Sequence, residues 1–286
     1  MKICSDWHIH SRNSCDGACM VMADLVSGAL RLGIEDYGVT DHLHTPYNLP
    51  DLESSRTEFD ALPANPRFHF GVEVSCVSQW ELDEIRKGDR DRPVYGIRSG
   101  GPAGAAPAIA LTAEHMERFG IEYVVAGTHW PLYVPFEREE IIRDYHRQNL
   151  FLACHPLVDI VAHPWWWMGH WKEPDGMYPG KPWFDDFGHI PESMHAEFAA
   201  AAVQHDTKVE INVGACLLSP NYPESFLRQY VEYLAALRER GVQFTIASDC
   251  HASQYEPPFE RAESVLEQAG FREKDFWCLA LRDGLQ

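Results

Sequence analysis

The strongest constraint on the fold of this chain is a repeated alternation of short apolar strands with amphipathic helices. Seven segments of mostly β-branched or aromatic residues, bounded by Gly, Pro or Asp, are predicted to be strands. They are Lys2–His8, Asp36–Thr40, Phe68–Ser75, Tyr123–Gly127, Asp159–Ala162, Lys208–Val213 and Gln243–Ala247. Apolar residues at helical spacing predict helices between several of them, at Met22–Leu32, Glu137–Cys154, Pro191–His205 and Pro223–Arg240.

This alternation predicts a parallel sheet with helices packed outside it. Seven strands fit a closed barrel better than an open dinucleotide-binding sheet, and no G-x-G-x-x-G motif follows the first strand. We expect one α/β domain over residues 1–286, with loop insertions near residues 80–107 and 165–190. The first insertion is rich in Gly, Pro, Ala and charge, and the second contains a run of three tryptophans.

The net charge and the cysteine content limit the kinds of binding partner and the cellular compartment that we expect for this chain. A formal net charge of −19 over 286 residues repels polyphosphate backbones, which disfavours long nucleic acids as partners. The sequence contains no run of 18 apolar residues, so we expect no membrane-spanning helix. The eight cysteines follow no regular framework and the N-terminus lacks the apolar segment of a signal peptide, so we expect a reduced, cytoplasmic protein.

Side chains that can bind metal gather at the ends of the predicted strands. In a parallel barrel these ends meet on one face, where functional groups collect. In the first group, alternation along the strand directs His8 and His10 to the same side. The groups are Asp6-Trp7-His8-Ile9-His10, Thr40-Asp41-His42, Gly71-Val72-Glu73, Gly127-Thr128-His129-Trp130, Ala162-His163-Pro164, Glu210-Ile211-Asn212 and Ser248-Asp249-Cys250-His251.

The chemistry of these groups favours a bound metal. Imidazole and carboxylate together suit zinc, manganese or iron, and the absence of cysteine from the candidate ligands argues against a structural zinc site. A single histidine at a strand end is more often a structural residue. Seven such groups favour a metal cluster, because buried ionisable groups need ions or partners to offset their desolvation.

The order of these motifs resembles that of PHP-domain proteins, the polymerase and histidinol phosphatase family. The resemblance extends from residue 6 to residue 251. It rests on Asp6-x-His8-x-His10, Asp16-Gly17, Thr40-Asp41-His42, Gly71-x-Glu73, His129, His163-Pro164 and Ser248-Asp249-x-His251. It implies a distorted (β/α)7 TIM-like barrel and a metal-dependent phosphoesterase with two or three divalent ions, which would be Zn, Mn or Fe.

The resemblance also implies nine metal ligands in three overlapping groups. The groups are His8, His10, Glu73 and Asp249 for a first ion, Glu73, His129 and His163 for a second, and Asp16, His42 and His251 for a third. Many phosphatases of the family have histidine in place of Asp16, and an oxygen ligand alters the affinity and the metal preference of that third site.

Hydrolysis is the chemistry expected of such a cluster. Adjacent divalent ions lower the pKa of a bridging water and hold the attacking and leaving oxygens of an ester in line. The hydroxide would attack phosphorus directly, with Asp249 as a candidate proton acceptor and His251 or His163 as a candidate proton donor to the leaving oxygen. Asp41 either orients a neighbouring ligand or caps its strand end.

Four residues are candidates for substrate binding. Trp165 and Trp166 follow a ligand-bearing strand end, where their rings either wall a pocket or pack the loop against the barrel. Arg12 lies between the H-x-H pair and Asp16, where it either approaches a phosphate or stays an exposed surface residue. Asn212 is followed by neither Lys nor Arg, unlike the corresponding strand of histidinol phosphatases, so histidinol phosphate is disfavoured as the substrate.

We therefore expect hydrolysis of a small phosphorylated metabolite, a phosphomonoester. Three alternatives stay open, which are phosphodiester hydrolysis of nucleotides or short oligonucleotides, amidohydrolase-type cleavage of a non-phosphate substrate, and a non-enzymatic metal-binding module. The last is disfavoured because degenerate modules lose ligands, whereas this chain keeps a full candidate set.

Overall fold

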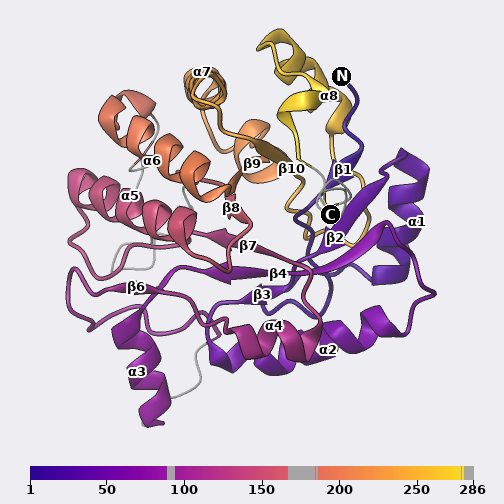
Figure 1. Cartoon of the computed structure of the whole chain (residues 1–286), viewed down its shortest axis with the longest axis horizontal. Helices are drawn as coiled ribbons and strands as arrows, with labels where there is room; N and C mark the ends of the chain where they lie inside the picture. The colour runs from indigo at the N-terminus through magenta and orange to yellow at the C-terminus, as the bar shows by residue number, and fades with distance from the viewer. Residues whose placement is uncertain (89–93, 167–183, 185, 278, 280–286) are drawn as a thin grey trace.

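Parallel strands form the centre of the fold, each lying beside the next along the chain (Figure 1). The computed structural model describes residues 1–88, 94–166, 184, 186–277 and 279. The main path of the sheet is β1 (Ser5–Asp6), β2 (Asp36–Val39), β4 (Phe68–Ser75), β7 (Tyr123–Gly127), β8 (Ile160–Ala162), β9 (Lys208–Asn212) and β10 (Phe244–Ala247). A further short strand, β3 (His42–Leu43), follows β2 and pairs with β4.

The two ends of this path, β1 and β10, meet and nearly close the sheet into a barrel. The Trp7 amide donates a hydrogen bond to the Ile246 carbonyl oxygen at 3.1 Å, and the Asp249 amide donates to the His8 carbonyl oxygen at 2.9 Å. The predicted α/β fold, a distorted (β/α)7 TIM-like barrel, is confirmed. The first strand is shorter than predicted, because regular pairing covers only Ser5–Asp6.

Eight α-helices within the described residues surround the strands (Figure 1). They are α1 (Met22–Leu32), α2 (Leu49–Asp60), α3 (Gln79–Lys87), α4 (Ala113–Phe119), α5 (Arg138–Cys154), α6 (Glu192–His205), α7 (Glu224–Glu239) and α8 (Phe259–Gln268). Shorter helical turns are η1 (Pro46–Asn48), η2 (Phe187–His189), the π-helical η3 (Val213–Leu217) and η4 (Glu273–Asp275). None of the helices described here has the length and apolarity that crossing a membrane requires.

The segment near residues 80–107, predicted to be a loop insertion, contains part of α3 and ends in a small ladder. β5 (Val77–Ser78) pairs antiparallel with β6 (Pro107–Ala108). The Ser78 side chain caps α3 by accepting a hydrogen bond from the Glu81 amide at 3.0 Å. Most of the second predicted insertion, near residues 165–190, lies outside the described residues. The insertion boundaries stay predictions.

Alternation along β7 separates the barrel interior from the layer that packs on the helices. A Cβ atom on Gly127 would lie 2.7 Å from His163 Cε1, so this position faces the space that the strand-end histidines occupy. Tyr123 and Val125 share its side of the strand and join Trp7 in a small buried cluster apart from the main core. Side chains therefore fill the barrel beneath the carboxyl ends of the strands, and chemistry is confined to those ends.

Candidate metal centre

The structure brings all nine predicted ligands together at the carboxyl ends of the strands. Their ligand atoms form four overlapping groups, and within each group the atoms lie within 4.8 Å of one another. The groups are His10, Asp16, His42 and His251; His8, Glu73 and His163; His8, His10 and Asp249; and His42, Glu73 and His129. Six of the nine side chains are buried, and the other three are half-buried, which leaves the centre open on one side.

Glu73, on β4, occupies the middle of the centre. Its Oε1 lies 3.0 Å from His129 Nε2 and 3.2 Å from His163 Nε2. Its Oε2 lies 3.0 Å from His8 Nε2 and 2.8 Å from His42 Nδ1, yet this oxygen makes no well-directed hydrogen bond to any described residue. Four imidazole nitrogens thus converge on the two oxygens of one carboxylate. This arrangement fits divalent cations, with one carboxylate able to reach two of them.

The H-x-H pair of the first strand shows the same convergence. His8 Nε2 and His10 Nε2 lie 3.0 Å apart. Asp249 Oδ1 lies 3.3 Å from His10 Nε2 and 3.6 Å from His8 Nε2. Two imidazole nitrogens and a carboxylate oxygen that approach so closely form a site of the ligand type that zinc, manganese and iron share.

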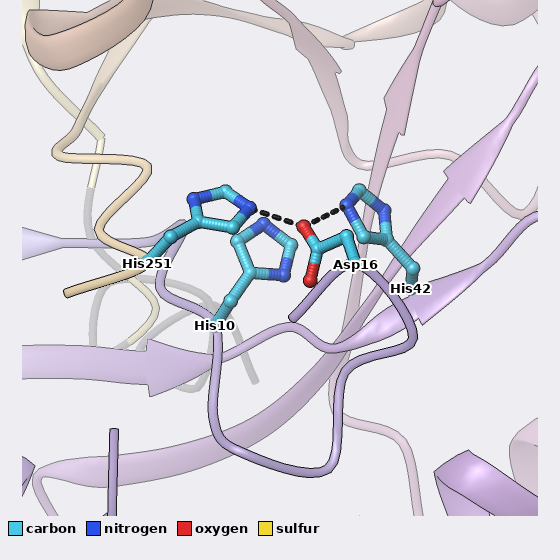
Figure 2. Close-up of side chains that lie close together, drawn as sticks. All are labelled: His10, Asp16, His42 and His251. Carbon is cyan, nitrogen blue, oxygen red and sulfur yellow. Dashed lines mark hydrogen bonds and ion pairs between the residues drawn. The ribbon is translucent and has the colours of Figure 1, made fainter. Parts of the chain in front are cut away.

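Asp16 joins the two sides of the remaining group (Figure 2). Its Oδ2 lies 3.1 Å from His42 Nε2 and also forms an ion pair with His251 Nε2. The His10 ring stacks on the His42 ring with centroids 4.3 Å apart. Asp16 belongs to the segment that precedes α1, so this group combines a loop carboxylate with histidines from three strand ends.

The surrounding imidazoles keep the carboxylates ionised. Burial alone raises the pKa of Glu73, but the charges of His42 and His8 hold it well below its ordinary value. Burial likewise raises the pKa of Asp249, and His8 lowers it well below the ordinary range. The pKa of Asp16 is also lowered, since hydrogen bonds from two histidines outweigh its burial. All three side chains are therefore available as anionic ligands.

Two of the candidate ligands have unusual backbone conformations, which set the direction of their side chains. His163 has φ 28° and Asp249 has φ 54°, both in the left-handed region that residues with a side chain seldom adopt. Such conformations cost about 1–3 kcal/mol each and cluster at functional sites, where the surrounding structure enforces them. At these two strand ends the chain turns sharply, which directs the side chains across the barrel mouth.

A buried carboxylate behind the centre, Glu210, belongs to one of the predicted strand-end groups but had no predicted role. Its Oε2 lies 2.7 Å from His8 Nδ1, and its Oε1 accepts hydrogen bonds from the His163 amide at 3.2 Å and from Asn212 Nδ2 at 2.7 Å. Asn212 Nδ2 also donates to Asp249 Oδ2 at 3.0 Å. Glu210 and Asn212 therefore orient ligands, and their alternation on β9 was a signal available in the sequence.

Asp41 holds the loop that follows the H-x-H pair. Its carboxylate accepts hydrogen bonds from the Ser11 amide and from the Ser55 hydroxyl, both at 2.6 Å. The loop from His10 to Asp16 therefore leaves the first strand in a fixed direction. Of the two roles expected for Asp41, these contacts favour orientation of a neighbouring ligand.

Two further buried residues, His44 and Ser75, extend the centre beyond the predicted set. His44 Nδ1 lies 2.6 Å from Ser75 Oγ, which in turn lies 2.8 Å from His129 Nδ1. Burial, together with the positive charge of His42, holds the pKa of His44 well below its ordinary value, so the ring is neutral. His42 and His44 repeat the H-x-H spacing of the first strand, which was the signal for His44.

The predicted substrate residues lie in different surroundings. The Trp166 ring is half-buried, with its centroid 4.8 Å from that of His163, so it borders the centre. Trp165 is only 2% exposed and packs in the core with Phe184, away from solvent. Arg12 is exposed and donates through Nε to Glu58 Oε2 at 3.0 Å.

Comparisons with known proteins agree with this architecture. No family model matches the sequence. The chain is 25% identical over 280 residues to a protein of Shewanella sediminis described as "Probable phosphatase", an alignment that covers 96% of this chain and 89% of that protein. A solved structure from Listeria monocytogenes, named as a candidate histidinol phosphatase (hisK), superposes with a TM-score of 0.56 at 14% identity, over 87% of this chain and 95% of that one. At this identity the second similarity shows the fold alone.

Proposed function

We propose that this chain is a metal-dependent phosphoesterase of the PHP type that hydrolyses a small phosphomonoester. The observation that carries the proposal is the convergence of imidazole and carboxylate groups on both oxygens of Glu73, at the mouth of a barrel. The similarity over nearly the full length to a protein described as a phosphatase supports phosphate esters as the substrate class.

The nine side chains would hold two or three divalent cations, with Zn, Mn or Fe suited to the ligand set. Cations bound there would polarise a phosphoryl oxygen and lower the pKa of a coordinated water molecule. Glu73 would contribute a ligand oxygen to each of two groups of histidines, because its two oxygens face different histidines. Glu210 and Asn212 would keep His8 and Asp249 in position.

Proton transfer is assigned to the side chains at the open edge of the centre. Asp249 is the proposed proton acceptor, since its carboxylate is ionised and lies beside the H-x-H pair. His251 is the proposed proton donor to the leaving oxygen, because its side chain is 39% exposed whereas that of His163 is 1% exposed. We assign His163 to metal binding, where its Nε2 faces Glu73.

The aromatic rings of Trp166 and Trp130 favour a substrate with a planar or apolar leaving group. Trp166 stands beside His163, and Trp130 stands beside His129 with ring centroids 5.4 Å apart. The same rings could stack a base, so hydrolysis of a nucleotide phosphodiester is the second candidate function.

The test is hydrolysis by metal-loaded protein of a panel of phosphorylated metabolites, with bis-p-nitrophenyl phosphate as the diester and a lactone as the non-phosphate substrate. Phosphate release from monoesters, abolished in His10→Ala and Glu73→Gln, is expected. His69→Ala and Glu122→Gln are matched controls, because this pair lies 2.8 Å apart near the amino end of β4, outside the centre. Turnover of the diester or the lactone alone would move the assignment to that reaction.

A further inference from the structure

Arg98 lies near the metal centre, with its guanidinium over the Trp130 ring. It lies in the segment between α3 and β6, is exposed to solvent, and places its guanidinium carbon 2.9 Å from the centroid of the Trp130 ring. Within the part of the chain that the structure describes, this guanidinium makes neither a hydrogen bond nor an ion pair. Burial by the surrounding protein lowers the pKa of this guanidinium to about 9.

The backbone that presents Arg98 is held firmly. The Ile97 amide donates to Glu81 Oε1, and the Ile97 carbonyl oxygen accepts from the Tyr133 hydroxyl at 3.0 Å. Gly96 has φ 78°, and a Cβ atom there would clash with Glu81 Oε1, so this turn favours glycine. Glu81 thus holds the backbone next to Arg98. The position of the guanidinium is therefore set before a ligand binds, which lowers the entropic cost of binding.

His44 supplies a second donor, because a chain of hydrogen bonds from His129 fixes which nitrogen of His44 carries the proton. When His129 Nε2 serves as a metal ligand, its proton must reside on Nδ1, which then donates to Ser75 Oγ. The Ser75 hydroxyl has one proton and donates it in a hydrogen bond to His44 Nδ1, so Nδ1 is the acceptor and the ring proton of His44 lies on Nε2. His44 is 2% exposed, and its Nε2 has no hydrogen-bond partner among the described residues.

One aromatic ring connects these two donors to the centre. The Trp130 ring carries Arg98 on its face, and its centroid lies 5.4 Å from that of His44 and 5.4 Å from that of His129. The Tyr95 ring also lies 5.4 Å from the His44 ring, on the same segment as Arg98. Two N–H groups that have no hydrogen-bond partner among the described residues, one of them cationic, therefore lie around the Trp130 ring, which itself lies beside the candidate ligand His129.

We propose that Arg98 and the Nε2–H of His44 form an oxyanion-binding subsite that holds the phosphoryl oxygens of the substrate. This inference rests on the proposed phosphoesterase function and supplies the phosphate-binding cation that the sixth strand lacks. A planar guanidinium matches two oxygens of a phosphate group, and a buried neutral donor adds direction without adding charge. Arg98 comes from the segment near residues 80–107, whereas His44 directly follows β3.

The test is calorimetric titration of metal-loaded protein with inorganic phosphate. Arg98→Met keeps the volume over Trp130 and removes the charge, whereas Arg98→Lys keeps the charge and loses the fork. His44→Asn keeps an amide near Ser75 and removes the pocket donor, whereas His44→Gln restores a donor at the position of Nε2. Arg228→Met, on an exposed arginine of α7, is the control.

We expect the Kd for phosphate to rise about 10- to 100-fold in Arg98→Met and His44→Asn, as for lost hydrogen bonds to a charged group. Arg98→Lys and His44→Gln should fall in between, with bound metal unchanged and KM for a phosphomonoester rising more than kcat falls. The proposed subsite is overturned if Arg98→Met binds phosphate with wild-type affinity, or if the wild-type protein shows no phosphate binding in the titration. If His44→Asn loses metal because the hydrogen bonds from His129 are disturbed, Arg98→Met decides, because it leaves those hydrogen bonds intact. Hydrolysis by the wild type is assayed separately, so failure of the proposed function is recognised independently.

Discussion

Replacing Glu210 with glutamine is expected to weaken metal binding without changing a ligand. When His8 presents Nε2 to a cation, its proton resides on Nδ1 and is donated to Glu210 Oε2 across 2.7 Å. The other oxygen of Glu210 already accepts from the His163 amide and from Asn212 Nδ2. A glutamine side chain has one acceptor end and one donor end, so one end must oppose a donor however the amide is turned.

The magnitude follows from the burial of this carboxylate. Both Glu210 and His8 are 0% exposed, so water cannot replace the lost partner. A buried donor left unsatisfied costs about 1–3 kcal/mol. Loss of a carboxylate partner of a metal-bound histidine typically costs about 10- to 100-fold in metal affinity. These two ranges agree, because 10- to 100-fold corresponds to about 1.4–2.7 kcal/mol at 25 °C.

The assay is competition for the metal with a chromophoric chelator, on protein stripped and then titrated with zinc or manganese. Glu197→Gln is the matched control, since the exposed Glu197 of α6 places Oε2 2.9 Å from Nε2 of His146 on α5, in a similar pair outside the centre. We expect the control to bind metal like the wild type. The reasoning is refuted if Glu210→Gln, folded by circular dichroism, also retains wild-type affinity.

Three other perturbations have expected outcomes. Removing metal with a chelator should lower the Tm by about 4–5 °C, since a ligand at about 100 times its Kd contributes about 2.7 kcal/mol. Equal Tm values with and without metal in differential scanning calorimetry would contradict this prediction. His195 is 8% exposed, and burial lowers its pKa to about 4. Its stabilising contribution is therefore full above about pH 6.5 and is lost as the pH falls towards 4, so the wild type should lose about 2 kcal/mol more than His195→Phe between pH 7.5 and pH 5 in urea unfolding; equal losses would exclude this cause. Gly127→Ala should weaken metal binding at least about tenfold, because its Cβ would lie 2.7 Å from His163 Cε1 and 3.0 Å from His129 Cε1; unchanged affinity by the same competition assay would show that the rings yield.

The strands could be predicted from the sequence because most of their side chains are β-branched or aromatic. Phe68–Ser75 and Tyr123–Gly127 are β4 and β7 as the structure has them, since runs of β-branched and aromatic residues in a buried parallel sheet leave few alternatives. Helix α2 was missed for the opposite reason. Its twelve residues are mostly polar and only Leu52 and Ser55 are buried, so it carries almost no apolar periodicity.

The candidate ligands were predictable for a related reason, whereas the residues behind them were only partly so. Strand ends meet on one face whatever the details of packing, so His129 and His163 could be expected near one another from their positions alone. Glu210 shares the face of its strand with Asn212, and this alternation could have identified it. Arg98 had no such signal, because a residue in an irregular segment is placed by tertiary contacts, here those of Ile97 with Glu81 and Tyr133.

What the sequence could not supply is the direction in which each ligand points, and the backbone at His163 and Asp249 shows why. Both residues follow a strand and both adopt positive φ, so simple alternation fails at the two positions where a ligand must turn across the barrel mouth. Neither residue is glycine, and hydrogen bonds to the rest of the barrel hold the left-handed conformation. The His163 amide donates to Glu210 Oε1, and the Asp249 amide donates to the His8 carbonyl oxygen. Glu210 therefore restrains both the ring of His8 and the backbone of His163. A single buried carboxylate couples the first strand to the fifth, and the geometry of the centre is a property of the closed barrel rather than of any one motif.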